Sequence, residues 1–146
     1  MKHIINTLKL AAMLLLLAGM VLSCGKDNEK ENVSLKGTKW KLEGIVDAKT
    51  GILTELEPKD CEECYTLTFD TDISAHGMAI KTPLCILNLY KMELCTPRAI
   101  LYDDEISDSM IYIEIFYSLI SYKHENNKLK LFYNQKGYLL YNLVDL

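Results

Sequence analysis

Several kinds of chemistry have little support in this chain because the residues that they need are scarce. Of its three histidines, only His76 and His124 lie beyond residue 23, and neither belongs to a recognisable motif. Nothing marks a serine, a histidine and an acid as a catalytic set, and no glycine-rich phosphate loop is present. We therefore predict a protein that is not an enzyme and that holds no cofactor or metal.

Basic residues are also in the minority. Residues 24–146 carry 14 basic and 20 acidic side chains, a net charge of −6, without a basic stripe. Such a domain is a poor match for nucleic acid. The same 123 residues suffice for one domain, and they hold all nine tyrosines, all three phenylalanines and the single tryptophan. This supply is large enough to build a hydrophobic core.

The N-terminus has the composition of an export signal. The first nine residues include Lys2 and Lys9 and no acidic residue. They are followed by an unbroken apolar run of 13 residues, 10–22. A basic start followed by a run of this length is typical of a secretory signal. A helix that spans the hydrocarbon core needs roughly 20 residues, so we predict a signal peptide over 1–23 rather than a membrane-spanning anchor.

The end of this run suggests a lipid anchor. Val21-Leu22-Ser23-Cys24 resembles a bacterial lipobox, which implies that Cys24 is acylated, with palmitate among its fatty acids, and becomes the mature N-terminus. The alternative is an ordinary cleaved signal in which Cys24 is incidental. The polar residues that follow predict a flexible tether over 24–34. They loosely resemble the acidic stretch that accompanies surface display in Bacteroidetes-type lipoproteins, so we expect an envelope protein, held in the outer membrane and facing the periplasm or the cell surface.

Alternating apolar and polar residues predict β-strands in the remaining single domain, 35–146. Thr38, Trp40 and Leu42 share one face of a segment whose other face carries charged residues, which is the pattern of a half-buried strand. Turn residues such as Asn126 and Gly137 separate the last strands. Further strands are expected at 65–69, 73–80, within 84–94, and at 121–124, 128–133 and 138–143.

One helix is expected at most, near 109–119. Asp108 is placed to cap it, and Ile113, Phe116 and Ile120 recur at spacings of three and four residues. The β-branched residues of this segment are equally compatible with a strand. The fold class predicted is therefore mainly β, or α+β, with a curved antiparallel sheet or a small barrel.

A family resemblance supports this fold class. The segment 35–42, Leu-Lys-Gly-Thr-Lys-Trp-Lys-Leu, resembles the L-x-G-T-x-W-x-L opening of many small envelope lipoproteins, and 66–72, 127–133 and 138–141 look like their later strands. The whole is similar to the lipocalin-like and META-like lipoproteins of Bacteroidetes. The chain departs from them in lacking a lipocalin Gly-x-Trp and the META cysteine motifs. The resemblance implies a fold and little about activity.

Four cysteines remain beyond Cys24: Cys61, Cys64, Cys85 and Cys95. In an exported domain they favour structural disulfides, with three possible pairings. An extended segment would turn Cys61 and Cys64 to opposite faces, whereas a turn at Glu62-Glu63 would let them pair. A redox Cys-x-x-C, for which the two glutamates supply the wrong charge, a zinc site and unpaired thiols remain open.

Six aromatic residues either line a ligand cavity or fill the core. We expect the protein to act as a binding or accessory module, with a membrane, an envelope protein or a small hydrophobic ligand as its partner. The alternatives are a hydrophobic-ligand binder that uses the barrel cavity and an extracytoplasmic thiol redox factor that uses Cys61 and Cys64. The six aromatic residues are Trp40, Tyr65, Phe69, Tyr122, Phe132 and Tyr141.

Overall fold

A computed structural model describes residues 34–95 and 107–144. The signal peptide, Cys24 and nearly all of the tether predicted from the sequence lie outside these residues, so those predictions stay predictions. The elements described are β1 (Lys39–Asp47), β2 (Leu53–Thr54), β3 (Thr66–Phe69), β4 (Ala75–Met78), β5 (Pro83–Asn88), β6 (Glu93–Leu94), α2 (Ser107–Phe116), β7 (Leu119–Glu125), β8 (Lys128–Tyr133) and β9 (Gly137–Val144).

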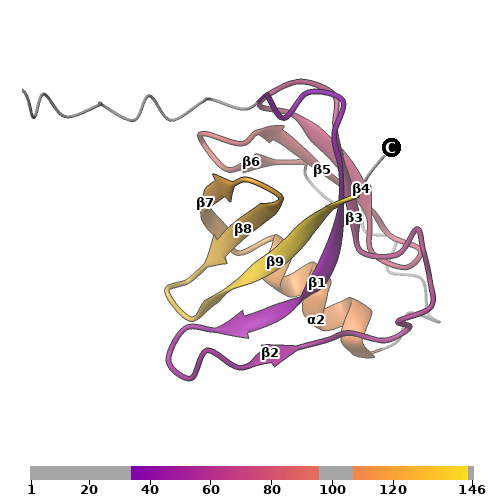
Figure 1. The fold of residues 1–146 in the computed structure, drawn as a ribbon, viewed down its shortest axis with the longest axis vertical. Coiled ribbons are helices and arrows are strands. Elements are labelled where there is room, and N and C mark those ends of the chain that lie inside the picture. Colours follow the sequence, from indigo (N-terminus) through magenta and orange to yellow (C-terminus); the bar gives the residue numbers. More distant parts are fainter. Residues whose placement is uncertain (1–33, 96–106, 145–146) are drawn as a thin grey trace, which may run out of the picture. The chain divides into compact units, whose positions relative to one another are not determined.

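The strands form one antiparallel sheet that curls into a half-barrel (Figure 1). Their order is β6-β5-β4-β3-β1-β9-β8-β7, and β2 also pairs with β1. Starting at β7, this order follows the chain through β9 and continues from β1 to β6. The turn between β5 and β6 approaches β7, where the ring centroids of Tyr90 and Tyr122 lie 6.0 Å apart. The predicted mainly β, curved antiparallel fold is confirmed.

The interior of the half-barrel is filled by side chains. The apolar face of each alternating strand points inward, and α2 adds Tyr112, Ile113 and Phe116 to the same buried cluster. The Tyr112 and Tyr141 hydroxyls meet at 2.6 Å and join α2 to β9. Each fully buried aliphatic or aromatic side chain contributes about 1.5–3 kcal/mol. The largest fully buried side chains are Trp40, Tyr112, Tyr141, Phe69, Phe116, Leu67, Ile86, Leu89, Leu129, Leu131 and Leu139.

The structure corrects the predicted helix. It forms, but spans Ser107–Phe116, and Leu119 already begins β7. Asp108 lies within its first turn, where its carboxylate accepts a hydrogen bond from the Glu57 backbone N–H. Ile120 is 52% exposed on β7 rather than buried by the helix. The β-branched and aromatic residues after Phe116 explain the earlier end, since they favour the strand. Within the described residues, no helix has the length and apolar character needed to span a membrane.

Strand β1 bends where its ladder with β9 shifts register between Leu42 and Gly44. Gly44 is required there, because a Cβ atom would lie 2.5 Å from the Thr54 carbonyl oxygen on β2. β2 pairs with β1, and residues 55–65 then lead the chain to β3, which also pairs with β1. This segment has little regular structure and carries the candidate site described below.

Candidate functional site

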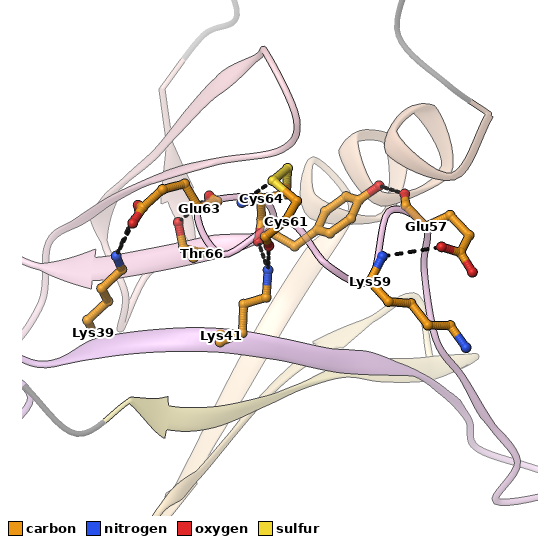
Figure 2. Close-up of a disulfide and its surroundings, with 9 residues drawn as sticks. Lys39, Lys41, Glu57, Lys59, Cys61, Glu63, Cys64 and Thr66 are labelled. Carbon is orange, nitrogen blue, oxygen red and sulfur yellow. Dashed lines mark hydrogen bonds and ion pairs between the residues drawn. A yellow bond between two sulfur atoms is a disulfide. The ribbon is translucent and has the colours of Figure 1, made fainter.

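The segment between β2 and β3 contains the Cys61–Cys64 disulfide (Figure 2). Glu62 and Glu63 form the turn, which was the second of the two geometries considered for these cysteines. The Cys64 backbone N–H donates to Cys61 Sγ at 3.2 Å. Cys64 is 3% exposed and belongs to the core cluster, and Cys61 packs against that cluster. The bridge therefore lies at the border of the apolar core, which is compatible with a structural role.

Two lysines rise from β1 to the turn (Figure 2). Lys39 forms an ion pair with Glu63 at 2.9 Å. Lys41 Nζ donates to the backbone carbonyl of Cys61, at 2.5 Å, and to that of Cys64. Partial burial is the largest influence on Lys41 and lowers the pKa of its ammonium group, while Glu63 acts in the opposite direction. Lys41 thus connects the disulfide turn to β1 through hydrogen bonds to uncharged backbone carbonyl groups.

Tyr65 follows the disulfide in a left-handed conformation, with φ of 54°. A bulky residue seldom adopts this conformation, and it is maintained only where the surroundings fix it. Here the Tyr65 N–H donates to the Ala79 carbonyl, its carbonyl accepts from the Leu42 N–H, and its hydroxyl donates to the Glu57 carbonyl at 2.6 Å. Tyr65 therefore precedes β3, although the sequence predicted it as the first strand residue.

Two hollows have Lys41 and Lys59 in common in their linings. The larger, about 460 Å³, is lined by Lys39, Lys41, Lys59, Asp60, Cys61, Glu62, Glu63 and Val144. The smaller, about 290 Å³, is lined by Lys41, Leu42, Glu43, Glu55, Leu56, Pro58, Lys59 and Tyr65. Sequence reasoning missed this site. Lys39, Lys41 and Glu43 have the spacing of an ordinary solvent-facing row, and no periodicity indicates that 55–65 crosses over them.

Cys85 and Cys95 form the second disulfide, which joins the start of the β5–β6 hairpin to the residue after β6. All four cysteines considered in the sequence are therefore paired, and the disulfide prediction is confirmed. No group of histidine, cysteine, aspartate and glutamate suited to a metal ion occurs among residues 34–95 and 107–144. The four thiols are also used up, so the zinc alternative is not supported.

The six aromatic residues divide into two groups. Trp40, Tyr65, Phe69 and Tyr141 are at most 3% exposed and belong to the core. Tyr122 and Phe132 are half-buried, on β7 and β8. The structure therefore does not bring the six together around one cavity.

The two histidines have separate surroundings. The His124 ring lies nearly perpendicular to that of Trp40, with the ring centroids 5.3 Å apart, and His76 pairs with Asp70 on the β3–β4 hairpin at 3.0 Å.

The domain is a half-barrel with a filled interior and two disulfides. These features define a small β-module of the kind found in oxidising compartments. A protein of Tannerella forsythia named "Putative lipoprotein" is 40% identical over 136 residues, which cover 90% of this chain and 89% of the relative. No protein-family model and no solved structure matches the chain. The chain belongs to the same lipoprotein family, and is a lipid-anchored protein of the cell envelope.

Proposed function

We propose that this lipoprotein is a binding module of the outer membrane, anchored through Cys24, and that it acts by binding at its surface rather than by catalysis. The observation that carries the proposal is that the hollows lie at the surface of the domain and the interior is filled. The interior is occupied by side chains such as Trp40, Phe116 and Tyr141, each at most 1% exposed, whereas the hollows of about 290 and 460 Å³ lie where residues 55–65 cross β1.

The finer fold assignment is also a proposal. The curled antiparallel sheet and the helix packed against it support a lipocalin-like or META-like module. Placement in the outer membrane is supported by the resemblance of the polar stretch after Cys24 to the tethers of Bacteroidetes-type lipoproteins. One acyl chain gives only marginal membrane binding, and two or more give stable anchoring.

Intact-mass measurement of protein purified from separated inner and outer membranes tests the anchor. We expect the mass of residues 24–146 with added acyl chains, two disulfides and enrichment in the outer membrane. A Cys24→Ala variant should lack the acyl mass and leave the membrane fraction. Recovery of the wild type with residues 1–23 attached and no acyl mass would overturn the proposal.

A second measurement separates surface binding from binding inside the barrel. Trp40 is the single tryptophan and lies 1% exposed in the core, so a ligand that entered the interior would change its fluorescence. Titration of the purified lipoprotein with palmitate should give no saturable change. A stoichiometric change would favour the hydrophobic-ligand alternative instead.

A further inference from the structure

The ammonium group of Lys41 has hydrogen-bonding capacity beyond the two bonds that hold it. It donates to the carbonyl oxygens of Cys61 and Cys64, and an ammonium group has three donors. Both acceptors are neutral, and no carboxylate lies within ion-pair distance of Lys41 in the part of the chain that the structure describes. Glu63 and Glu62 act on the Lys41 charge from beyond that distance, and Glu63 itself pairs with Lys39. One donor of Lys41 is therefore available to a ligand.

The other charged side chains in the lining of the smaller hollow, called the smaller pocket from here on, form ion pairs with nearby residues. Glu43 pairs with Lys128 at 2.7 Å, and Glu55 pairs with Lys59 at 2.6 Å. The hydrogen bond from Lys128 is the largest influence that lowers the pKa of Glu43, which keeps it ionised and engaged. With these pairs formed, Lys41 gives the pocket a net charge of about +1.

The two hollows differ in the charge that they offer. The larger hollow also contains Asp60 and Glu62, for which no pairing with a lysine is seen in residues 34–95 and 107–144. With the Lys39–Glu63 and Lys59–Glu55 pairs formed, Lys41, Asp60 and Glu62 leave the larger hollow a net charge of about −1, which disfavours an anion. The smaller pocket has Leu56, Pro58 and Tyr65 in its lining and a volume of about 290 Å³, which lies at the lower end for small-molecule sites.

We propose that the smaller pocket binds the carboxylate of a small organic acid, with Lys41 Nζ as the anchor and the apolar lining in contact with the body of the ligand. A volume of about 290 Å³ is suited to a small molecule. This inference rests on the proposed function, since it names the ligand class for the same site.

Isothermal titration of the full acylated protein with benzoate, acetate and benzylamine tests the inference. Benzoate supplies the carboxylate and an apolar body, acetate only the carboxylate, and benzylamine a similar body with the opposite charge. We expect benzoate to bind more tightly than acetate and benzylamine not to bind. Lys41→Gln should weaken benzoate binding at least tenfold, because a charge-assisted hydrogen bond is lost.

Matched variants keep the test informative if Lys41→Gln disturbs the turn. Lys123→Gln removes one lysine from β7, outside the lining of both hollows, and should change benzoate binding less than about threefold. Lys41→Arg keeps the charge and the donors and should retain binding. Equal binding of benzoate and benzylamine, equal loss in Lys41→Gln and Lys123→Gln, or no saturable benzoate binding would each overturn the inference. None of these results would alter the acylation and Trp40 measurements, which test the proposed function separately.

Discussion

The hydroxyl groups of Tyr112 and Tyr141 form a polar contact inside the core. They lie 2.6 Å apart, and both side chains are fully buried. Burial is the largest influence on each and raises the pKa of both phenols. Both groups are therefore neutral across the physiological range, and the hydrogen bond matters because water cannot replace a lost partner.

Removing one of the two hydroxyls should cost more than removing both. Tyr141→Phe leaves the Tyr112 hydroxyl buried without its partner, for which we expect a loss of about 1–3 kcal/mol in the free energy of unfolding. The double variant Tyr112→Phe/Tyr141→Phe should recover much of that loss. Urea denaturation of the two single variants and the double variant provides the test. Additive losses would show that the contact contributes nothing of its own.

Asp72 connects the start of the domain to the β3–β4 turn. Its Oδ1 atom accepts hydrogen bonds from the Ser34 hydroxyl and from the Leu35 and Lys36 N–H groups, at 2.7, 2.8 and 3.1 Å. The bond from Ser34 is the largest influence, and together they lower the pKa of Asp72.

The lowered pKa gives this contact a defined pH dependence. The folded value lies below the ordinary value of about 3.9, so the stabilisation is complete above that value and is lost as the pH falls through the folded pKa. Asp72→Asn should therefore be less stable than wild type at pH 7, and the difference should narrow at pH 3. Thermal unfolding at both pH values measures the two differences. A difference that did not change with pH would contradict the assignment.

Strands whose sequence alternates between apolar and polar residues could be predicted from the sequence. Trp40 and Leu42 on β1, and Leu129 and Leu131 on β8, follow the period of two that a half-buried strand imposes, and Asn126 and other turn residues mark the hairpin ends. β2 has only two residues, too few to show a period. The helix was placed but extended too far, because helical spacing continues into the first residues of β7.

The candidate site was not predictable, apart from its cysteines. Its geometry depends on the path of residues 55–65 across β1, which is set by contacts distant in sequence. Lys41 reaches acceptors 20 and 23 residues away, and Tyr65 adopts a left-handed conformation that tertiary contacts fix. Neither feature has a local sequence signal.

The two disulfides should stabilise the fold to different degrees. Cys85 and Cys95 are ten residues apart and Cys61 and Cys64 three apart, and a bridge restricts the unfolded chain more when it closes a longer loop. Replacing Cys85 and Cys95 by serine should cost about 3 kcal/mol, and replacing Cys61 and Cys64 about 2 kcal/mol. Chemical denaturation of the two double variants under oxidising conditions measures both losses. No loss from the Cys61/Cys64 pair would remove its structural role and favour the redox alternative.

At the scale of the described domain, the sheet curls into a half-barrel that leaves two outer strands (Figure 1). Chain order and spatial order agree around the half-barrel, with β6 and β7 as its outer strands. β6 has two residues and belongs to the disulfide-bonded β5–β6 hairpin, whereas β7 has seven and, in the part of the chain that the structure describes, pairs only with β8. A long edge strand is a template for pairing with another chain.

Charged side chains on β7 should protect this edge. Lys123 forms an ion pair with Glu125 at 2.8 Å, and both are more than half exposed. If two β7 strands paired, Lys123 of one molecule would lie close to Lys123 of the other and would lose water. The charge therefore opposes pairing between edge strands. Lys123→Val should therefore increase concentration-dependent association. Sedimentation velocity over a range of concentrations, with the acylated proteins in the same detergent, measures the effect.

Lys130→Val is the matched control for the edge. It removes one lysine from β8, which is already paired on both sides by β7 and β9, so the loss of charge exposes no free ladder. It also removes a contact in which Lys130 Nζ lies 5.2 Å from the Tyr138 ring centroid, which affects stability rather than association. If both variants associate equally, the effect comes from net charge alone. If only Lys123→Val associates, β7 is the edge at which the half-barrel must be protected.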